Sequence, residues 1–145
     1  MSKEMNVRFG WLKFMYIYTI VIAGGVGLGM IFVPDLIRFV FSMPNQDPIM
    51  LGMTGSLILS FAILSIFGLR DPLKFIPILM LQLSYKTIWL IGVILPRLVS
   101  GKLPMYTISI IILFVTYVIG DLIAIPFSYV FAKRSDVSTQ MEFPA

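Results

Sequence analysis

The 145-residue sequence contains no cysteine and no histidine, which excludes most metal and redox chemistry. Without these residues the chain cannot form disulfides, attach c-type haem, offer a histidine to haem or build the usual zinc sites. It also lacks a G-x-S-x-G motif, a phosphate-binding loop and paired carboxylates. Ser84 precedes Lys86 by only two residues, so a helix would point them to different faces. The sequence therefore predicts a protein that is not an enzyme and holds no cofactor and no metal.

Charged residues are also scarce, at 12% of the chain, whereas 59% of the residues are hydrophobic. A soluble domain of this length could not bury so much apolar surface, while a bilayer provides an apolar solvent. The net charge of +4 comes from basic residues scattered over short segments, so it does not indicate a nucleic-acid-binding surface. The composition predicts one integral membrane domain whose main partner is membrane lipid.

Four apolar segments are long enough to cross a bilayer as helices. They cover residues 14–33, 49–67, 75–96 and 105–132, and together form a single membrane domain, 14–132. The polar residues 1–13 precede this domain, and a polar tail that we expect to be flexible, 133–145, follows it.

The segment between the first two spans, PDLIRFVFSMPNQDP, is too apolar for an ordinary loop and too short to cross a membrane. Pro34 and Asp35 are a plausible helix start, and Asp35 can pair with Arg38 three residues later. The segment predicts a short helix lying in the membrane interface. The expected fold is therefore all-α: a four-helix transmembrane bundle with a short interfacial helix between the first and second spans.

Basic residues at the ends of the spans predict the orientation of the chain. Seven lie on the side of the termini and three on the other, namely Lys3, Arg8, Lys13, Arg70, Lys74, Lys133 and Arg134 against Arg38, Arg97 and Lys102. Cytoplasmic loops are the ones enriched in Lys and Arg. We therefore expect a multi-pass protein of a bacterial-type inner membrane, with both termini in the cytoplasm.

Small residues recur every four positions in the first two spans: Gly25 and Gly29, then Gly52, Ser56 and Ser60. Small side chains let helix backbones approach closely in lipid, so these positions predict helix-packing seams. The seam of the first span fits either the interior of the bundle or a dimer interface. A homo-oligomer or a larger membrane complex is therefore compatible with the sequence.

Two charged residues lie deep inside apolar segments, Lys86 in the third span and Asp121 in the fourth. A charge near the bilayer centre costs at least ~2.5–3.5 kcal/mol on insertion scales, so each should face a partner or water. Lys86 lies twelve residues from Lys74, and Asp121 lies twelve residues from Lys133. At ~1.5 Å per residue, both lie ~18 Å from the same membrane face. This matched depth predicts an intramembrane ion pair.

Polar and aromatic residues share the helix faces of the two charges. Gln82, Tyr85 and Trp89 fall on the Lys86 face, and Tyr117 precedes Asp121 by one turn. They predict a polar cavity around the pair. Such a pair can serve a proton path, an ion path or the head group of a ligand, or it can only fix helix packing.

Each span is accompanied by a short motif: Pro34–Leu36 after the first, Gly68–Pro72 at the end of the second, Gln82–Lys86 in the third and Gly120–Leu122 in the fourth. They resemble those of the broad DoxX-like group of small bacterial four-span membrane proteins, over about residues 11–132. The resemblance implies a four-span fold. Some DoxX proteins are implied to work beside quinone-linked oxidoreductases, but no catalytic residue follows from this.

The sequence favours a non-catalytic subunit or binding module with an intramembrane Lys86–Asp121 pair. The alternatives are an oligomeric transporter or channel that passes protons or a small ligand, and a quinone- or lipid-binding accessory of a membrane oxidoreductase. Water at Lys86 in an oligomer would favour transport. An apolar cleft beside Tyr85 and Trp89 would favour lipid or quinone, and a dry paired core would favour a scaffold.

Overall fold

The computed structural model describes residues 7–132, and every regular element in this range is helical. The elements are α1 (Phe9–Phe32), α2 (Pro34–Val40), α3 (Pro48–Arg70), α4 (Ile76–Trp89), the π-helical turn η1 (Leu90–Ile94), α5 (Leu95–Val99), α6 (Thr107–Ala124) and α7 (Phe127–Val130). The predicted all-α fold is confirmed. The first six residues of the predicted N-terminal segment and the whole predicted tail, 133–145, lie outside the described residues.

Four helices are long and apolar enough to cross a membrane, one for each predicted span. They are α1, α3, the continuous helix formed by α4, η1 and α5, and α6. Each has 18 to 24 residues, close to the ~20 needed for a hydrocarbon core ~30 Å thick. The chain therefore has the elements of a four-helix transmembrane bundle.

Two helix ends differ from the predicted spans because of proline. The third helix continues past Pro96 to Val99. In a regular α-helix, the ring of Pro96 would clash with the carbonyl group four residues earlier. The wider π-helical turn η1 lies just before this proline. The fourth helix ends at Ala124 instead of continuing to residue 132. Ile125 has an extended conformation (ψ 122°), as the residue before a proline commonly does, so Pro126 breaks this helix.

The first helix also begins earlier than predicted, at Phe9, so residues 9–13 of the expected polar segment are helical. Helix α2 lies between α1 and α3, where the sequence predicts a short helix. Pro34 occupies its first turn, and Arg38 forms the expected ion pair with Asp35. Arg38 also donates a hydrogen bond to Asn45, which holds the following loop against α2.

Helices α1 and α3 cross at two glycines. A Cβ atom on Gly27 would lie 2.9 Å from the carbonyl oxygen of Gly55, and one on Gly55 would lie 2.7 Å from the Cβ of Met30. Neither position leaves room for a side chain, so the two backbones touch directly. This contact joins α1 and α3 into one closely packed pair.

The small residues predicted to form packing seams do not lie at this crossing of α1 and α3. Gly29 lies against α2, where an added Cβ would be 2.5 Å from a side-chain atom of Ile37. The remaining four do not pack against another helix within residues 7–132: Gly25 and Gly52 have nothing within 4 Å of an added Cβ, and Ser56 and Ser60 are exposed. These four therefore form no seam between helices of residues 7–132, and an interface with another chain remains a prediction for Gly25. The inward positions, Gly27 and Gly55, lie one or two residues away, and one residue turns a helix by ~100°.

Replacing Gly55 by alanine should therefore destabilise the protein by about 1–3 kcal/mol, the usual cost of overpacking a tight contact. Thermal unfolding in detergent would measure this as a lower Tm. Gly52→Ala is the matched control, because the added methyl group meets open space on the same helix. Equal Tm values for the two variants would contradict the close crossing of α1 and α3.

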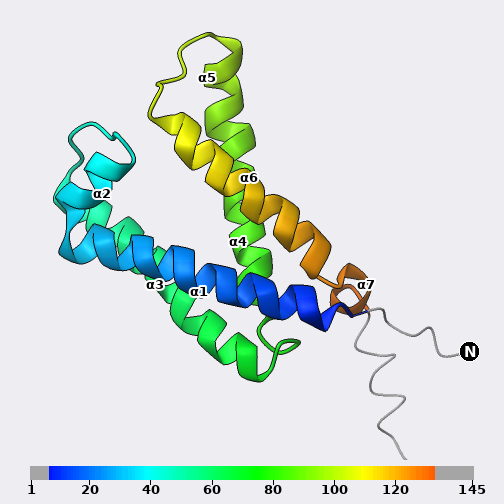
Figure 1. Ribbon diagram of the computed structural model, residues 1–145. Coiled ribbons are helices and arrows are strands. Elements are labelled where there is room, and N and C mark those ends of the chain that lie inside the picture. The colour runs from blue at the N-terminus through cyan, green and yellow to red at the C-terminus, as the bar shows by residue number, and fades with distance from the viewer. Residues whose placement is uncertain (1–6, 133–145) are drawn as a thin grey trace, which may run out of the picture.

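The bundle is tightly packed at one end and open at the other. The larger buried cluster consists of Leu12, Met15, Tyr16, Ile76, Leu79, Tyr117, Ala124 and Ile125. The Tyr16 hydroxyl donates a hydrogen bond of 2.7 Å to the carbonyl of Pro72, tying α1 to the connection before α4. Toward α2 and α5, helices α4 and α6 diverge from α1 and α3 (Figure 1). The two helix pairs are therefore close together beside α7 and further apart at the opposite end (Figure 1).

Candidate functional site

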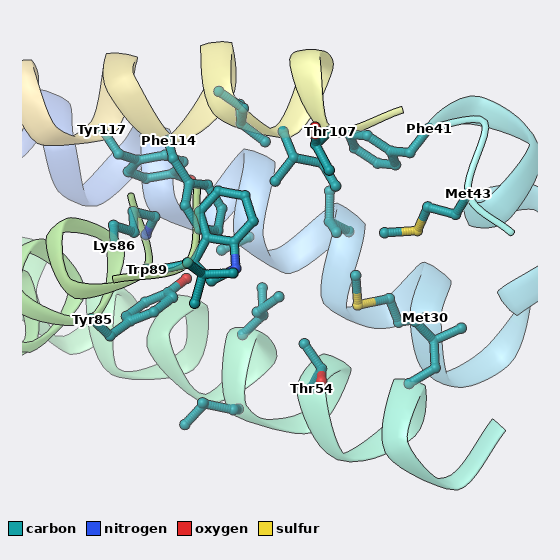
Figure 2. A pocket seen from close by; sticks show the side chains of 18 of the residues that line it. Met30, Phe41, Met43, Thr54, Tyr85, Lys86, Trp89, Thr107, Phe114 and Tyr117 are labelled. Atoms are coloured by element: carbon teal, nitrogen blue, oxygen red, sulfur yellow. The ribbon is translucent and has the colours of Figure 1, made fainter. Parts of the chain in front are cut away.

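A pocket of about 470 Å³ lies between the two helix pairs. Ligand pockets in proteins commonly measure ~300–1,000 Å³. Figure 2 shows Tyr85, Lys86, Trp89, Phe114 and Tyr117 at one end of it and Met30, Phe41 and Met43 at the other. The first end is the deep one, next to the packed core, and the second lies at the connection after α2. Most of the wall between them is aliphatic or aromatic.

Lys86 lies at the deep end with only 3% of its surface exposed. Its Nζ is 4.0 Å from the ring centroid of Tyr117, 4.6 Å from that of Tyr85 and 5.4 Å from that of Phe114. A cation within ~6 Å of an aromatic face is attracted by the ring quadrupole. The three rings therefore stabilise the ammonium group in part, although none of them supplies a negative charge.

Further ring contacts hold these aromatic side chains in place. Tyr85 stacks on Phe61 of α3 with centroids 5.5 Å apart, and Phe114 of α6 meets Tyr85 and Trp89 edge-on at 5.9 and 4.9 Å. Offset and edge-on pairs are the favoured arrangements of aromatic rings. The deep end of the pocket is thus built from aromatic side chains of three helices, α3, α4 and α6.

Asp121 is fully buried, but it does not form the predicted ion pair. Neither of its carboxylate oxygens has a hydrogen-bond partner among the described residues, and neither lies within 4.0 Å of the Lys86 ammonium. Lys86 lines the pocket, whereas Asp121 does not and lies in the packed end beyond it. Matched depth along two helices fixes height in the membrane but not the direction of a side chain, so it need not bring the two charged groups into direct contact.

Other buried polar groups surround the deep end. The Gln82 amide donates to the Thr19 hydroxyl at 3.3 Å, and that hydroxyl donates to the Met15 carbonyl at 2.8 Å. The Tyr117 hydroxyl has no partner among the described residues. Buried polar groups are nearly always hydrogen-bonded, so this enclosed hydroxyl is an exception next to the pocket.

The structure places all four predicted cavity residues, Gln82, Tyr85, Trp89 and Tyr117, on the wall of this one pocket together with Lys86. Sequence reasoning missed Phe114, although it lies seven residues before Asp121 and so on the same face of α6. It also missed Phe61 of α3, for which the sequence offers no signal, because nothing distinguishes this phenylalanine from those that face lipid.

The mouth of the pocket lies at the connections beside α2 and α5, where Gln46, Arg97 and Tyr106 line it. Arg97 donates a hydrogen bond of 2.9 Å to the carbonyl of Val93. Lys86 and Arg97 are the charged residues of the pocket wall, and no Asp or Glu of the described residues lines it. The pocket is therefore apolar along its length and positively charged at both ends.

Within residues 7–132, no group of three acidic, cysteine or histidine side chains gathers to hold a metal ion. The polar features of the site are instead an ammonium group, hydroxyls and amides in an apolar wall. Comparisons of the chain with protein-family models, with curated proteins and with solved structures found no match.

Proposed function

We propose that this protein is a non-enzymatic membrane module that binds an amphipathic molecule between its two helix pairs. The polar head of the ligand lies against Lys86, and its apolar chain extends along the pocket toward α2 and α5. One observation carries the proposal: a charged side chain without an ionic partner lies at the deep end of an otherwise apolar pocket of about 470 Å³.

The energetics of the buried charge support binding over a purely architectural role. An uncompensated charge in an apolar environment is costly, and aromatic rings offset only part of the cost. A scaffold would lower it by pairing Lys86 directly with Asp121, and this contact is absent from the described residues. A polar ligand head would supply the missing partner, and the apolar wall would receive its chain.

The distribution of basic residues supports a placement in a bacterial-type inner membrane with both termini cytoplasmic. In that orientation the pocket mouth, beside α2 and α5, faces away from the cytoplasm. The packed end, with Asp121, then lies on the cytoplasmic side of the pocket. A ligand would enter from the outer half of the bilayer.

The chain offers an internal probe for this binding, because Trp89 lines the pocket and Trp11 is the other tryptophan of the sequence. In a Trp11→Phe protein, the remaining fluorescence comes from the pocket. Brominated single-chain amphipaths, which quench nearby tryptophan, should quench it saturably in an uncharged detergent. The matched Trp89→Phe protein, which keeps the exposed Trp11, should show only weak and non-saturating quenching. Identical behaviour of the two proteins would overturn the proposal.

A transporter is a second candidate, favoured by the unpartnered Asp121 carboxylate beyond the deep end of the pocket. Buried carboxylates in membrane spans commonly mark proton relays. Vesicles containing the protein would then take up protons, and Asp121→Asn would abolish the uptake. A binding module alone predicts the same slow leak with and without the protein.

A further inference from the structure

We infer that the head group of the ligand is a single carboxylate, so that the pocket prefers single-chain carboxylic acids to neutral amphipaths of equal length. This inference rests on the proposed function and specifies the chemistry of its ligand. Four features of the pocket carry it: the sign of its charges, the hydrogen-bonding groups at its deep end, the number of charges there, and its size.

The sign of the charges favours an anion. Lys86 and Arg97 line the pocket and no described acidic residue does, while Asp121 lies outside it with neither carboxylate oxygen within 4.0 Å of the Lys86 ammonium. In a medium of low dielectric constant, a charge without a counter-charge is strongly disfavoured. A neutral head group could hydrogen-bond to Lys86 but would leave the positive charge uncompensated. A carboxylate both compensates the charge and accepts its hydrogen bonds.

The charged group at the deep end is a hydrogen-bond donor only. The Lys86 ammonium can donate three hydrogen bonds and accept none, and the Tyr117 hydroxyl lacks a partner among the described residues. The Gln82 amide is already engaged with Thr19. An ionised carboxylate is purely an acceptor, so it matches this set. An alcohol oxygen can also accept a hydrogen bond from the ammonium group, but it carries no charge to compensate the positive one.

The deep end holds one positive charge, which matches one carboxylate. A phosphate monoester carries about −1.5 to −2 charges near neutral pH and would leave negative charge uncompensated. Arg97 cannot contribute to the same head group, because eleven residues separate it from Lys86 along one continuous helix, or ~16 Å at ~1.5 Å per residue. This spacing leaves a long apolar stretch between the two cations, and a pocket of about 470 Å³ suits one chain rather than two.

The test compares ligands that differ only in the head group. In the Trp11→Phe protein, quenching of Trp89 is titrated with a brominated fatty acid, the brominated alcohol of equal chain length and the corresponding phosphate monoester. The fatty acid should bind at least about tenfold more tightly than the alcohol, the usual scale of one charge-assisted hydrogen bond. Lys86→Met should remove this preference while alcohol binding persists. Lys102→Gln, an exposed lysine outside the pocket wall, should leave it unchanged.

The possible outcomes separate this inference from the proposed function. Equal affinity for acid and alcohol in the unmodified site overturns the carboxylate assignment and leaves the binding module standing. Preference for the phosphate monoester also overturns the assignment. Saturable quenching by none of the three overturns the proposed function itself. If Lys86→Met does not fold, Lys86→Gln serves as the neutral variant, and a preference that survives in it contradicts the role of Lys86.

Discussion

Replacing Thr54 by phenylalanine is expected to weaken ligand binding at least about tenfold while the protein stays folded. Thr54 lies on α3 at the pocket wall, and its hydroxyl makes only a local hydrogen bond, of 3.0 Å, to the carbonyl of Met50 (Figure 2). An aromatic ring there would fill part of the channel through which the ligand chain must pass. The loss would appear as a higher concentration of brominated amphipath for half-maximal quenching of Trp89.

Ser56→Phe provides a closely matched control for this substitution. Ser56 lies two residues further along α3, is exposed on the outer face, and makes the same kind of hydrogen bond, of 2.8 Å, to the carbonyl of Gly52. It does not line the pocket. Binding by Ser56→Phe should equal that of the parent protein. Equal binding by both variants would mean that the ligand lies elsewhere on the protein.

Much of the fold follows from the sequence because membrane helices are governed by simple constraints. Length and apolar composition identify the four long helices, since ~20 residues are needed to cross the hydrocarbon core. Helix periodicity groups Gln82, Tyr85, Lys86 and Trp89 on one face, and the structure places all four on the pocket wall. Both results depend on local geometry, which the sequence specifies directly.

The features that sequence reasoning missed depend on how the helices meet. The pocket exists because α4 and α6 diverge from α1 and α3, and no spacing within one helix encodes that divergence (Figure 1). The position of the Lys86 ammonium, 4.0 Å from the centroid of the Tyr117 ring and not within 4.0 Å of an Asp121 oxygen, is likewise set by packing between α4 and α6. The close crossing of α1 and α3 falls on Gly27 and Gly55. The spacing within one helix does not show which of its small residues faces the other helix.

The separation of Lys86 from Asp121 carries the central claim that Lys86 serves a ligand. Two buried charges in direct contact satisfy each other, so removing either one usually costs ~3–5 kcal/mol and removing both restores stability. Here neither residue has a direct ionic partner to lose. Asp121→Leu also removes two buried oxygens that lack hydrogen bonds, which should stabilise the protein by about 1–3 kcal/mol.

The most direct test is a double-mutant cycle on ligand-free protein, with Lys86→Met, Asp121→Leu and the double variant compared by thermal unfolding in detergent. We expect both single variants to be at least as stable as the parent protein, and Lys86→Met to lose the preference for carboxylate amphipaths. The contrary result would be two strongly destabilised single variants and a double variant that recovers the parent Tm. That pattern would show a direct ion pair that holds the helices together, and would leave the pocket without its proposed anchor.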